Sequence, residues 1–270
     1  MANTRNLDGM NIKRKKKIEK KPAATNKERK RTLSTILSQI HLDYHAPESW
    51  QKIIPPDTLE RLLETGEEVG VHVLVGDVRQ STFLMKESIS LPRFAQITRD
   101  LMKAIKSTAS SNEGWFDKFT GDGFIIYWIY GADNPDKYIQ RILAFCLALL
   151  SYFPEVMNEY RSNSRNFPAG VGLSLGVDSG PCSLVEIGGG LDIIGPPVVG
   201  ASRMVCAAQP FETLFNVSIG AKLYENRKEM AAKHGIHVSK KKINTKEYGE
   251  GGGKDGSISG QEAYSVQFRK

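Results

Sequence analysis

WFDKFTGDGFIIYW, residues 115–128, is the stretch of sequence that decides the fold. Aromatic and β-branched residues flank Thr120-Gly121-Asp122-Gly123, and such a tetrapeptide between two apolar runs predicts a β-hairpin. The turn carries Asp122 at its tip. Earlier in the chain, VLVGDVRQST at residues 73–82 is a second apolar run, and it leads directly into Asp77. Two aspartates, 45 residues apart, therefore each follow a predicted strand.

Asp77 and Asp122 are candidate ligands for a divalent cation. Carboxylate oxygens are the donors that Mg²⁺ and Mn²⁺ prefer, and two carboxylates suit a site that holds two ions for phosphoryl transfer. We therefore predict two Mg²⁺ or Mn²⁺ ions at Asp77, the adjacent Val78, and Asp122. Either aspartate alone would more often be a helix cap or a type I′ turn residue, whereas the two together favour a site.

The segment that follows Asp77 is a candidate phosphate-binding turn. Main-chain N–H groups at the start of a helix attract phosphate groups, and residues 78–82 lie where the predicted strand passes into a helix. Ser81 and Thr82 are therefore candidate substrate contacts, while the role of Arg79 in the same turn stays open. Lys118, four residues before Asp122, adds a cation to the constellation.

Charge divides the chain into a basic tail and a nearly neutral remainder. Residues 1–32 contain 12 Lys or Arg and 3 Asp or Glu, whereas the whole chain carries a net charge of +7. We expect this tail to be disordered, because it has few apolar side chains to bury. Residues 33–69 are expected to form a helical N-terminal segment, and residues 70–270 a single larger domain. In residues 33–69, the spacing typical of a helix is seen in Leu33, Ile36, Leu37 and Ile40.

The apolar patterns after residue 70 predict alternating strands and helices. Strands are expected at 71–77, 115–119, 124–129, 170–180, 215–219 and 263–268. Helices are expected at 83–106 with a break near Pro92, and at 135–160, 198–208 and 221–234. The order β-α-β-β-α-β is the ferredoxin-like or palm arrangement of an α/β (α+β) fold, with an antiparallel-rich sheet and helices on one face. It brings the end of the first strand beside the hairpin, so that Asp77 and Asp122 would meet.

Composition restricts the class of protein. Hydrophobic residues are 40% of the chain, which is enough for a substantial core. Cys146, Cys182 and Cys206 lack the spacing of a zinc site or a disulfide framework, so we expect ordinary buried thiols of a reducing compartment. The longest apolar stretch, around residues 142–150, is too short to span a bilayer. We expect a soluble, cytoplasmic protein without a signal sequence or a stable membrane partner.

Taken together, these motifs resemble the catalytic domain of class III adenylate and guanylate cyclases. The resemblance spans roughly residues 70–268. It rests on Asp77, Lys118-Phe119-Thr120-Gly121-Asp122-Gly123, Asp192-Ile193-Ile194-Gly195 and Ala201-Ser202-Arg203-Met204. It implies an enzyme that converts a nucleoside triphosphate to a 3′,5′-cyclic nucleotide and pyrophosphate. It also implies a head-to-tail homodimer with its active sites at the interface.

The resemblance gives each matched residue a role. Asp77 and Asp122 fall on the two metal-binding aspartates, and Lys118 and Asp192 fall on the pair that reads the base. Arg203 falls on the arginine that stabilises negative charge at phosphorus, a task for which a guanidinium is suited.

A lysine near the C-terminus would hold the triphosphate. Lys246 is the first choice, with Lys240, Lys241 and Lys242 as alternatives. In the implied dimer, one copy supplies the two metal-binding aspartates and the other supplies the base-reading pair and the arginine.

The sequence departs from the family pattern in two places. The family's asparagine, which positions the ribose, is replaced by Val199, and a valine side chain makes no hydrogen bond. The glycine-aromatic pair that usually follows the first aspartate is replaced by Gln80-Ser81. The chain is therefore expected to be a divergent member.

Among divergent cyclases, the segments DVRQST and KFTGDG are most similar to the stand-alone pyrimidine cyclases of Pycsar antiphage signalling. That resemblance implies cyclic UMP or cyclic CMP as the product. Lys118 and Asp192 are the adenine-type pair, but a lysine can also donate to a pyrimidine carbonyl and an aspartate can accept from its amino or imino group. Tyr44 or Trp50 would fill the space beside a smaller base, although we favour simple core packing for both.

Three alternatives remain open. The first is an adenylate cyclase that makes cyclic AMP from ATP. The second is a catalytically inactive cyclase fold that acts as a regulator, which the valine at position 199 favours. The third is a nucleic-acid-binding module that uses the basic tail, but the tail lacks interleaved aromatic residues, so we expect no stable nucleic-acid partner.

Overall fold

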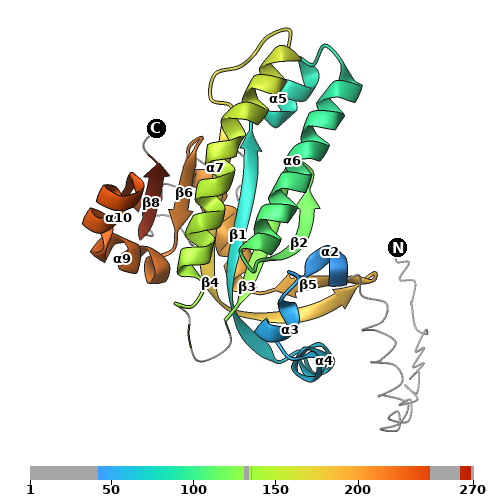
Figure 1. Ribbon diagram of the computed structural model, residues 1–270, viewed down its shortest axis with the longest axis vertical. Coiled ribbons are helices and arrows are strands. Elements are labelled where there is room, and N and C mark those ends of the chain that lie inside the picture. Colours follow the sequence, from blue (N-terminus) through green and yellow to red (C-terminus); the bar gives the residue numbers. More distant parts are fainter. Residues whose placement is uncertain (1–41, 131–133, 135, 244–261, 269–270) are drawn as a thin grey trace, which may run out of the picture.

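The computed structural model describes residues 42–130, 134, 136–243 and 262–268. The described chain begins with short helices of at most ten residues. A single large sheet follows, with longer helices packed on it (Figure 1). The elements are α2 (Leu42–His45), α3 (Trp50–Ile53), α4 (Pro56–Thr65), β1 (Glu68–Arg79), α5 (Ser81–Lys86), α6 (Leu91–Ser111), β2 (Trp115–Thr120), β3 (Gly123–Ile129), α7 (Ile139–Ser162), β4 (Gly172–Ile187), β5 (Gly190–Ile194), α8 (Pro196–Ala207), β6 (Glu212–Phe215), α9 (Val217–Glu225), α10 (Arg227–His234), β7 (Ile236–Lys242) and β8 (Glu262–Phe268).

The sheet has eight strands in the described residues, in the order β2-β3-β1-β4-β6-β8-β7, with β5 paired to β4. Strand β1 lies between β3 and β4 and is antiparallel to both. Strands β4 and β6 are parallel, whereas the other pairs are antiparallel. The first four strands, with α6 and α7 between them, form the predicted β-α-β-β-α-β unit, so the predicted α/β fold class is confirmed.

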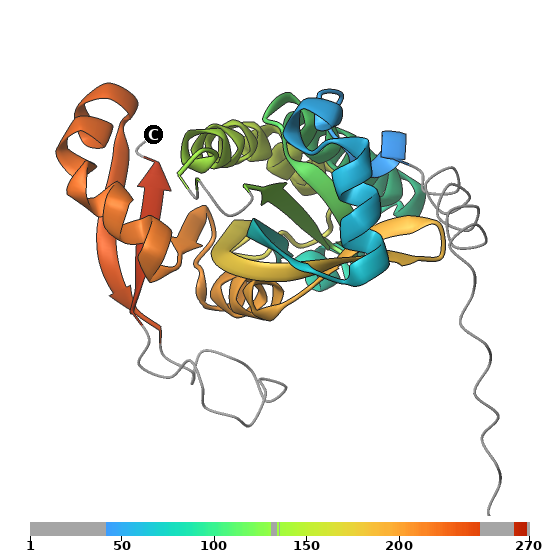
Figure 2. The ribbon, with the colours of Figure 1, turned by 90° about the horizontal axis from the view of Figure 1, so that it is seen from below.

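Helices cover both faces of this sheet, which corrects the prediction that they lie on one face. Leu74 of β1 packs in a buried cluster with residues of α6 and α7. Its neighbours Val73 and Val75 point to the opposite face, because side chains alternate along a strand, and they pack with Ala201 and Val205 of α8. Figure 2 shows the long helices above the sheet and the orange α8 below it.

Helix α7 is the longest helix described and lies in the core. By length and composition it could cross a membrane, since it has 24 residues and an apolar window with a mean hydropathy of 1.4. This corrects the prediction that the apolar stretch is too short. Ten of its residues are buried against the sheet and α6, and Ile142, Phe145 and Phe153 are fully covered. We therefore interpret α7 as a core helix.

Several predicted boundaries were wrong. The strand expected at 170–180 is longer and continues to Ile187. After a glycine turn, β5 pairs with its second half. Neither β5 nor β7, which carries several lysines, was predicted. The strand expected at 215–219 lies at 212–215, and the helix expected at 221–234 is two helices. Cys206 is exposed rather than buried. The predictions for residues 1–41 lie outside the described residues.

Gln80, between β1 and α5, has a left-handed backbone with φ of 65°. Residues with a Cβ adopt this conformation at a cost of about 1–2 kcal/mol, whereas glycine adopts it freely. The cyclase pattern that the sequence resembles has a glycine here, a residue that adopts this conformation freely. In this protein Gln80 carries the strain instead.

We expect Gln80→Gly to stabilise the protein by roughly 0.5–1 kcal/mol, because the relief of strain exceeds the added entropy of the unfolded chain. Urea unfolding of the purified variant measures the change. Gln80→Ala is the matched control and should be nearly neutral, because it removes the exposed side chain but keeps the Cβ. Equal stabilisation by both variants would show that the side chain, and not the backbone, carries the cost.

Candidate active site

The two predicted metal-binding aspartates lie side by side. The pairing of β1 with β3 sets Asp77 directly opposite Gly123, the residue that follows Asp122 at the hairpin turn. Burial raises the pKa of the Asp77 carboxyl; Arg79 opposes this rise and the nearby charge of Asp122 adds to it. The prediction that the two aspartates meet across adjacent strands is therefore confirmed.

Both aspartates are held in ways that the sequence did not predict. Only Gly121 of the two central turn residues has a positive φ, 75°. A type I′ turn needs a positive φ at both, so this is the type II′ pattern. Asp77 caps no helix either, since Gln80 occupies the N-cap position of α5. Oδ2 of Asp77 is instead 3.3 Å from Nη1 of Arg79.

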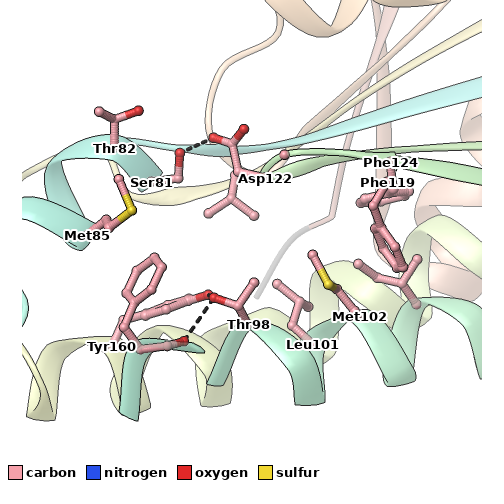
Figure 3. Close-up of a pocket in the computed structure, with 14 residues that line it drawn as sticks. Ser81, Thr82, Met85, Thr98, Leu101, Met102, Phe119, Asp122, Phe124 and Tyr160 are labelled. Carbon is pink, nitrogen blue, oxygen red and sulfur yellow. Dashed lines mark hydrogen bonds between the residues drawn. The ribbon is translucent and has the colours of Figure 1, made fainter. Parts of the chain in front are cut away.

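Ser81 joins the turn after β1 to the hairpin. Its hydroxyl donates a hydrogen bond to Oδ2 of Asp122. Figure 3 shows this contact above an apolar pocket of about 300 Å³, which is walled by side chains of α5, α6 and the hairpin. Thr82 lines the same pocket. Of the two predicted contacts, Ser81 is therefore bonded to Asp122, and Thr82 lies next to Ser81 at the same pocket.

These carboxylates fit a divalent cation that takes the rest of its ligands from elsewhere. No group of three or more His, Cys, Asp or Glu side chains gathers as a candidate metal cage in the part of the chain that the structure describes. Magnesium typically keeps several waters and uses one or two carboxylates together with phosphate oxygens. A pair of adjacent aspartates beside an open turn matches that requirement.

Arg79, whose role the sequence left open, ties β1 to the end of α8. Its Nε lies 3.0 Å from Oγ of Ser174, and its Nη2 donates to the carbonyls of Val205, Cys206 and Ala208, the last two at 3.1 and 3.0 Å. A guanidinium can donate to several acceptors at once, because its N–H donors are fixed in one plane. Arg79 therefore holds Asp77 and α8 in one arrangement.

The predicted base-reading pair is also brought together. Nζ of Lys118 on β2 lies 2.5 Å from Oδ2 of Asp192 on β5. Burial lowers the pKa of Lys118, but the hydrogen bond to Asp192 and the charges of Asp117 and Asp192 outweigh it, so the pKa lies above its usual value. Lys118 therefore stays charged, and its side chain is 43% exposed.

Asp117 is a residue of this site that sequence reasoning missed. Its side chain is 2% exposed, and Nζ of Lys118 lies 3.5 Å from its Oδ2. Burial and the charge of Asp192 raise the pKa of Asp117 to about 7, although Lys118 opposes them. The signal in the sequence was a charged residue inside the apolar run WFDKF, next to the lysine that the family pattern matches.

Helix α8 carries the remaining matched residues. Val199 is 50% exposed, and Arg203 lies one turn further along the same helix. Of the lysines considered for the triphosphate, Lys241 is already paired, with its Nζ 2.9 Å from Oε2 of the buried Glu212. Lys246 lies outside the described residues, so its predicted role stays a prediction.

The two aromatic residues considered for the base pocket differ from each other. Trp50 packs edge-on against the buried Trp115, with ring centroids 6.1 Å apart, as core packing predicts. Tyr44 is 44% exposed, and Nζ of Lys106 lies 3.4 Å from the centre of its ring. Core packing therefore accounts for Trp50 but not for Tyr44.

We expect Arg79→Lys to lower the free energy of unfolding by about 2–4 kcal/mol, because a lysine cannot donate to all of these acceptors and leaves partly buried carbonyls without a donor. Chemical denaturation measures the loss. Arg93→Lys is the matched control: its partner Glu159 and Arg93 itself are each 51% exposed, so the change should stay within about 0.5 kcal/mol. Equal losses in both variants would contradict this role for Arg79.

No family profile matches the sequence, and no curated protein sequence matches it. Solved structures do match. The adenylyl cyclase CyaB from P. aeruginosa is 18% identical with a TM-score of 0.59, over 76% of this chain and 96% of that one. The guanylyl cyclase Cya2 is 15% identical with a TM-score of 0.56, over 76% and 95%.

A third similar structure is not named as a cyclase. It is a class III adenylyl cyclase-like ATP-binding protein from Pseudomonas aeruginosa, 18% identical with a TM-score of 0.51, over 62% of this chain and 37% of that one. At these identities the likeness concerns the fold. The chain thus has the fold of the catalytic domains of class III adenylyl and guanylyl cyclases.

Proposed function

We propose that the protein is a nucleotidyl cyclase, which converts a nucleoside triphosphate to a 3′,5′-cyclic nucleotide and pyrophosphate. The observation that carries the proposal is the adjacency of Asp77 and Asp122 at the β1–β3 pairing, in a fold that adenylyl and guanylyl cyclases share. The pairing of Lys118 with Asp192 supports it, because it offers a donor and an acceptor to one base.

The reaction forms one bond and breaks one. The 3′-oxygen of the ribose attacks the α-phosphorus and loses its proton, and the bond from that phosphorus to the bridging oxygen breaks as pyrophosphate leaves. Asp77 and Asp122, with the main chain near Val78, would hold two Mg²⁺ or Mn²⁺ ions, and bound ions would lower the pKa of the hydroxyl and neutralise phosphate charge. Arg203 would donate to the oxygens at phosphorus.

The triphosphate needs further contacts. Ser81 lies at the turn beside Asp122, and Thr82 is exposed at the same turn. We assign both to the phosphates, together with Lys246. The hydrogen bond from Ser81 to Asp122 would also fix the direction in which that carboxylate presents its free oxygen.

We propose a homodimer whose active sites lie between the copies. Apolar side chains are exposed on the elements that carry the second half of the site: Ile194 is 59% exposed two residues after Asp192, and Val199 is 50% exposed one turn before Arg203. Ile187, at the end of β4, is 58% exposed. If a second copy covers this surface, Asp192 and Arg203 of one copy would come close to Asp77 and Asp122 of the other.

The base is the narrower part of the proposal. The similar structures include both adenylyl and guanylyl cyclases, and the guanylate type usually carries a glutamate where this chain has Lys118. The segments around Asp77 and Lys118 favour a pyrimidine, UTP or CTP, and a role in antiphage signalling in the cytoplasm. Cyclic AMP from ATP is the alternative, since Lys118 and Asp192 also complement adenine.

A second candidate function is a catalytically inactive regulator that binds a nucleotide. Val199 favours it, because its exposed side chain offers no hydrogen bond to a ribose. The similar ATP-binding protein from Pseudomonas aeruginosa is described as cyclase-like. Against it stands the retention of both aspartates and of the paired lysine.

We expect Asp77→Asn and Asp122→Asn each to reduce cyclisation by roughly a thousandfold or more, because metal ions supply several kcal/mol of stabilisation to the transition state. The purified protein is incubated with Mn²⁺ and each of the four common nucleoside triphosphates, and products are identified by mass spectrometry. Asp100→Asn, on the exposed face of α6, is the control and should keep full activity. Activity in either site variant would refute the metal assignment.

We expect Lys118→Glu to change the preference among the nucleoside triphosphates while the dependence on Mn²⁺ concentration stays the same, because the variant replaces a donor by an acceptor at the base. Steady-state rates with each triphosphate measure the preference. Lys103→Glu on α6 makes the same charge change at an exposed position and should leave the preference unaltered. Unchanged relative rates in Lys118→Glu would rule out a base-reading role.

A further inference from the structure

Asp117 lies in a β-bulge that turns its side chain toward the base-reading pair. In the pairing of β2 with β3, Phe116 faces Ile126 and Lys118 faces Ile125, so Asp117 has no partner on β3. Neighbouring side chains on a regular strand point to opposite faces, whereas a bulge re-aims one of them. Nζ of Lys118 accordingly lies only 3.5 Å from Oδ2 of Asp117.

The carboxyl of Asp117 is buried without a hydrogen-bond partner in the described residues. Both of its oxygens are covered and accept no hydrogen bond, although Oδ2 lies 3.5 Å from Nζ of Lys118, and the hydroxyl of Tyr127 on the neighbouring strand is also without a hydrogen bond. A buried carboxylate is costly unless it is paired or protonated. Packing alone does not account for this carboxyl, because an apolar residue would pack there at no such cost.

The groups that face Asp117 come from every element packed around it. Lys118 is on the same strand and Asp192 is on β5; both act on the charge of Asp117. Tyr127 on β3 has a pKa raised well above its usual value by burial, so it stays neutral. His45 on α2, whose Nδ1 lies 3.0 Å from the carbonyl of Phe116, has a pKa lowered by burial. Lys106 on α6 lies beyond His45 and remains a fixed cation over Tyr44.

Asp117 is thus the group of this cluster that changes charge close to neutral pH. Its pKa is raised to about 7, by burial first and by Asp192 second, and Lys118 is the group that holds it down. In its protonated form the cluster consists of one ammonium and one carboxylate. In its ionised form two carboxylates share the ammonium of Lys118.

We propose that Asp117 is a positioning residue for Lys118, which makes recognition of the base depend on the uptake of one proton by the enzyme. Lys118 is bonded to Asp192 in the described structure, so both side chains must turn to the base when a nucleotide binds. An ionised Asp117 attracts the ammonium of Lys118 and so keeps it away from the base. A protonated Asp117 has no charge to attract it, so Lys118 can turn to the base. Once Lys118 leaves, Asp117 loses the cation beside it and takes up a proton. The inference rests on the proposed base-reading role of Lys118.

We expect KM to rise as the pH increases above about 7. We expect kcat not to change in the same pH range in the same way. For one linked proton, the upper limit is a tenfold rise in KM for each pH unit. In Asp117→Asn the side chain stays neutral, so its KM should equal that of the wild type near pH 6 and lie several-fold below it at pH 8.5. The substrate is whichever nucleoside triphosphate gives most product with Mn²⁺.

Two further variants separate positioning from simple damage to the strand. Tyr127→Phe removes a buried hydroxyl on the neighbouring strand but keeps Asp117, and should show the wild-type profile. Asp117→Thr keeps a residue suited to a strand and should show the flat profile if Asp117→Asn folds poorly. A flat profile in Tyr127→Phe, or a wild-type profile in both Asp117 variants, would overturn the proposal.

A measurement without substrate tests the titration itself. The folded protein holds a proton on Asp117 that the unfolded chain releases above about pH 4. The stability that this proton contributes is complete below pH 4 and is lost as the pH rises through 7. Urea midpoints of the wild type should therefore fall relative to those of Asp117→Asn between pH 4 and 7. Parallel midpoints across that range would overturn the inference.

The outcomes also distinguish this inference from the proposed function. If no triphosphate yields a product, the proposed function fails and the inference fails with it. If a product forms and the KM profiles of the wild type and Asp117→Asn coincide, only the inference fails. If the profiles diverge as expected, both stand.

Discussion

The antiparallel pairing of β1 with β3 is the constraint on which the rest of the structure depends. Its register sets Asp77 opposite Gly123, and a shift by one residue would send every side chain of β1 to the other face. The register is fixed because both faces of β1 are buried, one under α6 and α7 and the other under α8. The core therefore determines where the two carboxylates meet.

The site concentrates features that cost stability. Gln80 holds a left-handed backbone in the turn after Asp77, and Asp117 buries a carboxyl without a hydrogen-bond partner in the described residues. Both lie within a few residues of side chains that we assign to substrate or metal. Strain and buried charge persist where the surrounding structure holds them in place and where function uses them. Arg79, with its fork of bonds to α8, supplies that support on one side.

The sequence predicted one half of the site more completely than the other. Asp77, Asp122 and Ser81 lie at local signals, namely the end of an apolar run and the TGDG turn, and local signals are readable because neighbouring residues create them. The contact of Lys118 with Asp192 joins residues 74 positions apart. Only the resemblance to cyclases pointed to that pair, because β5 has five residues and follows a run of glycines, so it was not recognised as a strand. The place of Asp117 in the site was not predicted, because a β-bulge has no sequence pattern of its own.

By itself, the sequence determined the order of the elements, the β-α-β-β-α-β unit and the adjacency of the two aspartates, because hydrophobic periodicity and turn residues act over short distances. The tertiary structure alone decided which faces the helices cover, that β5 folds back along β4, and that Arg79 anchors α8. It also decided that Asp117 points at Lys118. These features depend on the packing of segments far apart in the chain, where burial and charge are set by neighbours that no local pattern identifies.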